Sequence, residues 1–266
     1  MEDLELFRLL GRCRKMQLMH RRSKPFSLDD PYRTKRPAIS KIIFLSCEGS
    51  VTEEEYIEIL SQIYDGVKNR VRLISVAEDE IHTQPQKRTK KQNQVLGKTK
   101  PWQLVERIDR FKSEKESIYE FSKYPEDEFW IVSDIDDNLD NHKVEFQNAI
   151  NECDEKGYKY AISNPFFEIW LLLHHDEVTE EDRKYAVTEN HKYESTDHFR
   201  IRLAERNAPL REQKHLQLEH YSDEKVRIAV HRAKDIVNGK DEKIPSEYGT
   251  YVYKIVEEIL DVAENN

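Results

Sequence analysis

The sequence lacks the features that mark membrane proteins and ATPases. No apolar run approaches the roughly 20 residues that a helix needs to span a bilayer. The start of the chain is polar, carries charges of both signs and does not resemble a signal peptide. We therefore expect a soluble, cytoplasmic protein without membrane contacts. The chain also contains no GxxxxGK[ST] motif, so any ATPase activity would have to come from a partner chain.

Cysteine and net positive charge are scarce as well. The three cysteines, Cys13, Cys47 and Cys153, are far apart and form no CxxC pair, which argues against a disulfide framework or a structural zinc site. Cys47 could be a nucleophile, but no histidine lies next to it in sequence, so a packing role is favoured. The net charge of −9 excludes a global positive field. Contact with nucleic acid must therefore come from a local basic patch or a bound metal ion.

Apolar segments that favour β-structure alternate with helical patterns over much of the chain. Four such segments predict strands: 42–45, 71–76, 129–132 and 158–163. Their alternation with helices predicts an α/β fold with a mostly parallel, four-stranded sheet flanked by helices. No strand is expected in the highly charged region that follows. The predicted organisation is a basic N-terminal arm (1–40), an α/β domain (41–178) and a helical C-terminal region (179–266).

Two basic stretches are open to more than one interpretation. The arm at 1–40 could be a solvated tail or could contact phosphates or a partner, and the solvated tail is favoured. The loop at 82–100 has little apolar content, and it could equally be disordered or bind a phosphate backbone. The candidate nucleic-acid contacts come from this loop and from the C-terminal region: Lys87, Arg88, Lys90, Lys91 and Lys192.

Acidic residues follow two of the predicted strands. Asp134 and Asp136 follow the strand at 129–132, and they point to the same side of an extended chain, so they can hold one hard cation. Glu48 follows the strand at 42–45 and can be a metal ligand or a proton acceptor. Because carboxyl ends of parallel strands meet at one edge of a sheet, we expect these three residues to converge as the catalytic set. Such oxygen ligands favour Mg²⁺ or Mn²⁺ and phosphodiester hydrolysis.

The turn after Glu48 carries two further local signals. Gly49 allows the chain to turn tightly there. Thr52 and Glu55 have the spacing of a capping box, which predicts the start of a helix. Glu48 would therefore face the amino terminus of that helix.

The helix after the fourth predicted strand is apolar nearly all round, which predicts that it is buried. Asn164 is a suitable N-cap and Pro165 a suitable first helical residue. Glu168 and His174 are unusual on such a helix, because buried polar groups need partners or a site. A hydrogen bond that locks the helix and a direct role at the site are both left open.

The segments around these residues are similar to a known family. A Glu-Gly pair at 48–49 and an Asp-x-Asp motif at 134–136, each after a strand, resemble the Toprim domain of topoisomerases, primases and overcoming-lysogenization-defect nucleases. More narrowly, CEGSVTEEEY at 47–56 and NPFFEIWLLLH at 164–174 are similar to the RloB family. The resemblance covers the predicted α/β domain well and the C-terminal region loosely.

This resemblance implies a Toprim-like, Rossmannoid sheet and a Mg²⁺-dependent nuclease in bacterial or archaeal defence against phage, through abortive infection. It also implies a partner ATPase of the AAA or ABC type. Glu48 would be a metal ligand or general base, and Asp134 and Asp136 metal ligands. Many Toprim nucleases have an aspartate where this chain has Thr52. Glu53 could supply that carboxylate instead, so the number of metal ions is left open.

Two other functions are compatible with the same residues. The chain could use a Toprim fold to bind nucleic acid or sense a partner without cutting. It could also transfer nucleotides, as primases do, although it has no separate nucleotide-binding motif. For a nuclease, the expected substrate is DNA or RNA, transfer RNA included. The oligomeric state is left open.

Overall fold

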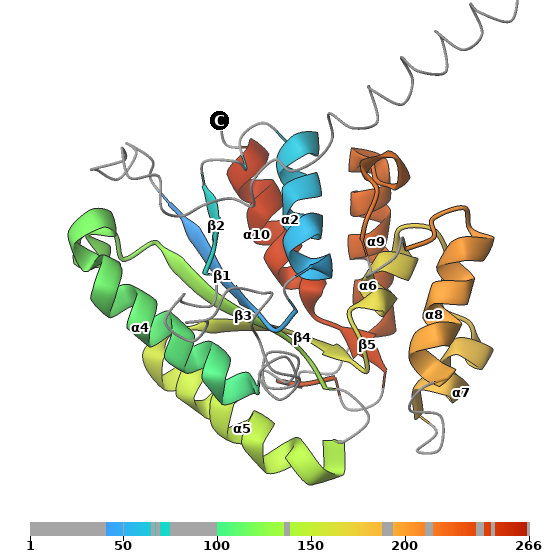
Figure 1. Cartoon of the computed structure of the whole chain (residues 1–266), viewed down its shortest axis with the longest axis horizontal. Coiled ribbons are helices and arrows are strands. Elements are labelled where there is room, and N and C mark those ends of the chain that lie inside the picture. Colours follow the sequence, from blue (N-terminus) through green and yellow to red (C-terminus); the bar gives the residue numbers. More distant parts are fainter. Residues whose placement is uncertain are drawn as a thin grey trace, which may run out of the picture. The chain divides into compact units, whose positions relative to one another are not determined.

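One five-stranded sheet carries helices on both of its faces (Figure 1). The computed structural model describes residues 41–49, 51–64, 67, 70–74, 100–135, 139–187, 194–210, 215–237, 242–245 and 248–264. The strands are β1 (Ile43–Cys47), β2 (Val71–Leu73), β3 (Glu128–Asp134), β4 (Lys159–Asn164) and β5 (Gly249–Thr250). Residues 34–266 belong to one compact unit. The predicted arm at 1–40 lies outside the described residues.

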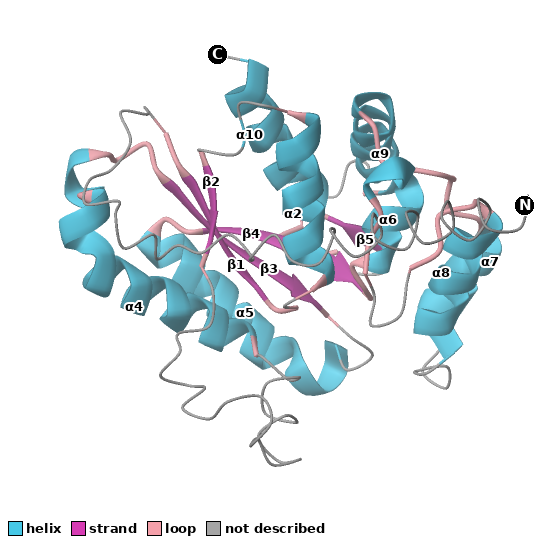
Figure 2. Ribbon diagram, turned by 45° about the horizontal axis from the view of Figure 1, so that its top comes forward, coloured by secondary structure: helices cyan, strands magenta, loops and turns pink. Residues whose placement is uncertain are grey.

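Helices connect the strands and cover them. The described α-helices are α2 (Thr52–Ile63), α4 (Pro101–Tyr119), α5 (Leu139–Lys156), α6 (Glu168–Leu173), α7 (Glu180–Val187), α8 (Glu194–Glu205), α9 (Asp223–Ile236) and α10 (Val252–Glu264). Figures 1 and 2 show α4 and α5 on one face of the sheet, and α2, α6, α9 and α10 on the other. None of these helices combines the length and the apolar character that crossing a bilayer requires.

The sheet has the order β2-β1-β3-β4-β5. β1 to β4 are parallel to their neighbours, and only β5 is antiparallel, along β4. The α/β class and the mostly parallel sheet are therefore confirmed, whereas the predicted number of four strands is wrong. The C-terminal region contributes the fifth strand. At two residues, β5 is too short to show the alternation that marks a strand in sequence.

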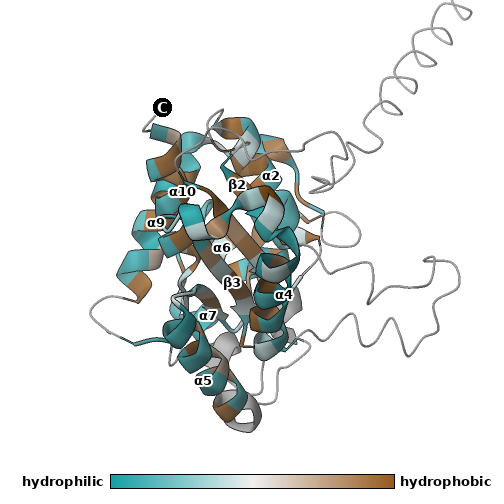
Figure 3. Ribbon diagram, turned by 90° about the vertical axis from the view of Figure 1, so that its left-hand side faces the viewer, coloured by the Kyte–Doolittle hydropathy of each residue, from teal (hydrophilic) through white to brown (hydrophobic). Residues whose placement is uncertain are grey.

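The strands are buried on both sides, as expected for a parallel sheet between helices. Beneath α4, Phe44 stacks on Phe129 with ring centroids 5.0 Å apart. Phe111 of α4 packs on Phe44, with ring centroids 5.4 Å apart. The neighbouring Ile43 and Leu45 belong to the core beneath the opposite helix layer. Figure 3 shows the hydrophobic strands between the two layers.

The predicted start of the helix after β4 is wrong. Asn164 is the last residue of β4, and α6 begins at Glu168 rather than at Pro165. Asn164 does not cap the helix, because its Nδ2 donates to Pro245 O at 2.8 Å. This bond, with the pairing of Asn164 and Gly249, ties β4 to the segment that leads into β5.

The predicted capping box of α2 is also absent. Thr52 is already helical, and no side chain caps the helix. Glu55 instead accepts hydrogen bonds from His215 Nδ1 at 2.5 Å and from Leu216 N at 2.7 Å. The carboxylate therefore joins α2 to the C-terminal region, a contact across some 160 positions of sequence.

His174 lies in an aromatic cluster at the end of α6. Its Nδ1–H donates to Trp170 O at 2.9 Å, so Nε2 accepts from Tyr56 O–H at 3.0 Å. Tyr221 packs against the imidazole, edge to face. Only 2 % of His174 is exposed. A hydrogen bond that locks the helix and a direct role at the site were both left open for His174. These contacts are of the first kind.

We expect His174 to make the protein less stable in acid. Burial lowers its pKa from 6.5 to about 3, so between these values the unfolded chain binds a proton that the folded protein does not. The free energy of unfolding should therefore fall as the pH drops below 6.5, by up to about 1.4 kcal/mol per pH unit from this residue. Urea unfolding of wild type and His174→Phe between pH 7 and pH 4.5 measures the effect.

The variant should be less stable at pH 7, because Tyr56 O–H loses its acceptor. Its stability should nevertheless depend less steeply on pH. If the free energy of unfolding changed equally with pH in the two proteins, the lowered pKa of His174 would be contradicted.

Candidate metal and active site

Glu48 directly follows β1 and is held by β3. Its N–H donates to Val132 O at 2.9 Å, which continues the pairing of the two strands. Its Oε2 accepts from Ser133 Oγ at 2.5 Å and from Asp134 N at 3.1 Å. The carboxylate is half-buried. The carboxyl end of β3 therefore fixes the orientation of Glu48.

Asp134 ends β3 and connects it to α6. Its Oδ2 accepts from Phe167 N at 3.1 Å. Burial raises the pKa of Asp134 well above its usual value, and the negative charges of Glu53, Glu48 and Glu168 raise it further. The Phe167 amide opposes this shift. Three carboxylates from separate elements therefore lie close enough to Asp134 to disfavour its charge.

Glu168 is the first residue of α6 and only 3 % exposed. Its Oε1 lies 3.6 Å from Arg200 Nη2 of α8. Since Phe167, the residue before it, binds Asp134, the start of α6 sets both carboxylates at the same place. Glu168 is thus the member of the predicted α6 pair that lies at the acidic site.

Glu53 approaches the site from the first turn of α2. A Cβ on Gly49 would lie 2.2 Å from Glu53 Oε2, so a side chain at 49 would displace that carboxylate. Gly49 does not have a left-handed φ. The glycine is therefore explained by the close approach of Glu53, in addition to the turn predicted from sequence.

Arg107 of α4 is a cation beside these acids. Its Nη1 donates to Cys47 O at 2.9 Å. Burial and the charge of Glu53 raise the pKa of Glu54 to about 7, and Arg107 opposes the shift. Burial also raises the pKa of the Cys47 thiol well above its usual value. The packing role predicted for Cys47 fits its 6 % exposure, because a protonated, buried thiol is a poor nucleophile.

Several predicted site residues lie outside the described residues. Asp136 is one of them. The others are the candidate nucleic-acid contacts: Lys87, Arg88, Lys90, Lys91 and Lys192. Glu48 and Asp134 are brought together as predicted, with Glu53 and Glu168 nearby.

Sequence reasoning missed two residues that the structure places at this site, Ser133 and Arg107, and it favoured a solvated helix face for a third, Arg200. Ser133 could have been noticed as a buried hydroxyl between an apolar strand and an acidic turn. The two arginines carried no local signal, because Arg107 contacts a residue 60 positions away and Arg200 belongs to a charged helix.

The residues present suit a hard divalent cation. All four acids offer carboxylate oxygens, the ligands that Mg²⁺ and Mn²⁺ prefer. A cation would offset the charges that raise the pKa of Asp134. Within the described ranges, no group of three His, Cys, Asp or Glu side chains is arranged to hold a metal ion. Among the described residues, a bound cation would draw on Glu48 and Asp134, which lie together.

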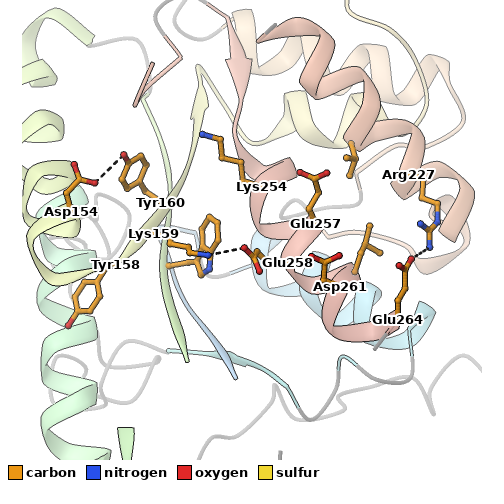
Figure 4. Close-up of a pocket in the computed structure, with 13 residues that line it drawn as sticks. Asp154, Tyr158, Lys159, Tyr160, Arg227, Lys254, Glu257, Glu258, Asp261 and Glu264 are labelled. Carbon is orange, nitrogen blue, oxygen red and sulfur yellow. Dashed lines mark hydrogen bonds and ion pairs between the residues drawn. The ribbon is translucent and has the colours of Figure 1, made fainter. Parts of the chain in front are cut away.

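A cavity of about 890 Å³ lies elsewhere, along the amino-terminal half of β4 (Figure 4). Several of its carboxylates are paired with cations. Lys159 Nζ lies 2.9 Å from Glu258 Oε1, and Arg227 Nη2 lies 2.7 Å from Glu264 Oε1. These carboxylates are compensated by cations, unlike the crowded acids at the carboxyl edge. The acidic site is therefore the better candidate for metal chemistry.

Comparison with known proteins identifies one family. A family model described as RloB-like protein matches residues 43–259. The match spans β1 to β5 and most of α10, and it includes all four carboxylates. No curated protein and no solved structure matches the chain.

Proposed function

Because this chain belongs to the RloB-like protein family, we propose that it is a metal-dependent nuclease that hydrolyses nucleic-acid phosphodiester bonds. The observation that carries the proposal is the gathering of Glu48, Glu53, Asp134 and Glu168 at one edge of the sheet. Crowded carboxylates destabilise a fold unless a cation or a proton compensates them. Such a cluster is expected at a site that binds metal.

Some side chains at this site would bind the metal ion, and others hold those ligands in position. Glu48, Asp134 and Asp136 would hold the cation, which polarises the phosphodiester and lowers the pKa of an attacking water. Ser133 Oγ and the Asp134 amide keep Glu48 in place. The Phe167 amide does the same for Asp134. These hydrogen bonds set the ligands before a substrate arrives, which is how active sites avoid reorganisation during the reaction.

The finer parts of the proposal depend on the resemblance of the motifs. They are a Toprim-like classification of the sheet, a role in defence against phage, a cytoplasmic location and a partner ATPase. The mostly parallel sheet with acids at its carboxyl edge is compatible with that classification. A partner ATPase would supply the nucleotide chemistry for which the chain has no GxxxxGK[ST] motif.

The test is incubation of the purified full-length chain with plasmid DNA and with total RNA, with Mg²⁺, with Mn²⁺ and with EDTA. We expect one polymer to shorten, and only where a divalent cation is present. Shortening in EDTA would contradict metal dependence.

A second function is favoured by the lack of a three-residue metal site within the described ranges. The chain would then bind nucleic acid or a partner without cutting. Binding of a polymer without shortening under any metal condition would support this function over hydrolysis.

A further inference from the structure

The side chains that border the acidic site suit a single nucleic-acid strand. α4 begins at the carboxyl edge of the sheet, where Arg107 binds Cys47 O. Trp102 lies in the first turn of α4 and is 38 % exposed, although most large apolar side chains of the described residues are buried. Trp102 lies five positions before Arg107, which is about 7–8 Å along the helix axis and about 140° around it. An exposed indole therefore lies at the end of α4 that borders the carboxyl edge of the sheet, on a different face of the helix from Arg107.

Arg200 approaches the acidic site from another helix, α8. It reaches from α8 to within 3.6 Å of Glu168, and 35 % of its side chain is exposed. Other basic residues of α8 are directed elsewhere. Arg202 Nη2 binds Asp176 Oδ2 at 2.6 Å, and His198 Nε2 binds Asp182 Oδ1 at 2.6 Å. Among the described basic residues of α8, Arg200 is thus the one directed at the acidic site.

The two arginines and the indole suit the phosphates and the bases of a nucleic acid. A phosphate backbone is repelled by a chain of net charge −9 and by four clustered carboxylates. Arginines next to those carboxylates can hold phosphates there through paired hydrogen bonds. An indole stacks on a base only when the face of that base is free, as it is in single strands and unpaired loops. Glu168 is nearly buried, which favours a flexible strand over a rigid duplex.

We propose that the site binds single-stranded nucleic acid, or an unpaired loop, which crosses from α4 to α8. A base stacks on Trp102, and phosphates contact Arg107 and Arg200 at the acidic site. This inference rests on the proposed function, because it names the class of substrate that the same site takes. The strand passes over the carboxylates between the two arginines, where the scissile phosphate would lie.

Fluorescence anisotropy of a labelled, unstructured oligonucleotide tests the inference. Full-length Glu48→Gln protein is used, with Mg²⁺ present, and the same sequence is measured as a duplex. We expect the single strand to bind at least about 10-fold more tightly than the duplex, and Trp102→Ala to weaken it by about 10-fold. Trp102→Phe should retain most of the affinity. Arg200→Ala should weaken binding and lower the slope of log K against log salt by about 1.

Two matched variants control for loss of a surface side chain. Ile228→Ala removes another exposed apolar group, on α9. Arg206→Ala removes a basic residue beside α8 that pairs with Asp176. Neither should change binding. Equal affinity for duplex, or no effect of Trp102→Ala, would overturn the inference. Thermal unfolding of each variant confirms that it is folded.

The two proposals fail in different ways. If single strands bind as expected while wild type shortens no polymer, hydrolysis fails and the ligand class stands. If wild type cuts a duplex as fast as the matching single strand, the ligand class fails and hydrolysis stands.

Discussion

Glu48→Gln is expected to abolish metal-dependent cleavage and to leave the fold intact. The glutamine oxygen can still accept from Ser133 Oγ and Asp134 N, so the position of the side chain is retained. What is lost is the negative charge that a hard cation requires. Loss of about 3–4 kcal/mol of metal stabilisation corresponds to a rate about 100- to 1,000-fold lower. The measurement is the initial rate of polymer shortening at saturating Mg²⁺.

The matched control for this variant is Glu155→Gln, on an exposed turn of α5. It makes the same chemical change outside the site and should leave the rate unchanged. Binding of Mn²⁺, followed by electron paramagnetic resonance, gives a readout that does not depend on the substrate. If Glu48→Gln cleaved at the wild-type rate and bound Mn²⁺ as the wild type does, Glu48 would not be a metal ligand.

The meeting of Glu48 and Asp134 could be predicted from the sequence because their signals are local. Glu48 and Asp134 each adjoin an apolar strand, and parallel pairing brings such ends to one edge. Contacts distant in sequence gave no such signal. The contact between Glu55 and His215 spans 160 positions, and the prediction from four local residues was a capping box. Glu55 is used for a tertiary contact, so the local rule does not hold there.

The pair on α6 shows why the sequence could not separate equivalent candidates. Glu168 and His174 are both polar residues on a buried helix, and either could have belonged to the site. At about 100° per residue, six positions place them some 120° apart around the helix. One therefore faces Asp134 and the other faces Tyr56. The position where β4 ends decides which face of α6 meets the acids. That end, at Asn164, was hidden because Asn164 resembles an N-cap residue.

Asp134→Asn is expected to stabilise the metal-free protein and to inactivate it. Burial and three neighbouring carboxylates raise the pKa of Asp134, so its charge is disfavoured in the folded state. Asparagine has no charge, and its side-chain oxygen can still accept from Phe167 N. At pH 7, without metal, we expect the free energy of unfolding to rise by roughly 1–2 kcal/mol. The gain should shrink as the pH falls towards 4, because protonation then removes the same charge from the wild type.

A divalent cation should reverse the order of stability, so that the wild type becomes more stable than Asp134→Asn. Mg²⁺ binds only the folded site, so it should raise the unfolding midpoint of the wild type with the logarithm of its concentration above the Kd, and leave Asp134→Asn nearly unchanged. Asp235→Asn, on the exposed surface of α9, is the matched control and should respond to Mg²⁺ as the wild type does. A variant that is less stable without metal, or equally stabilised by Mg²⁺, would show that Asp134 serves the fold. The opposite result would mean that the chain keeps a destabilising carboxylate because the cation requires it.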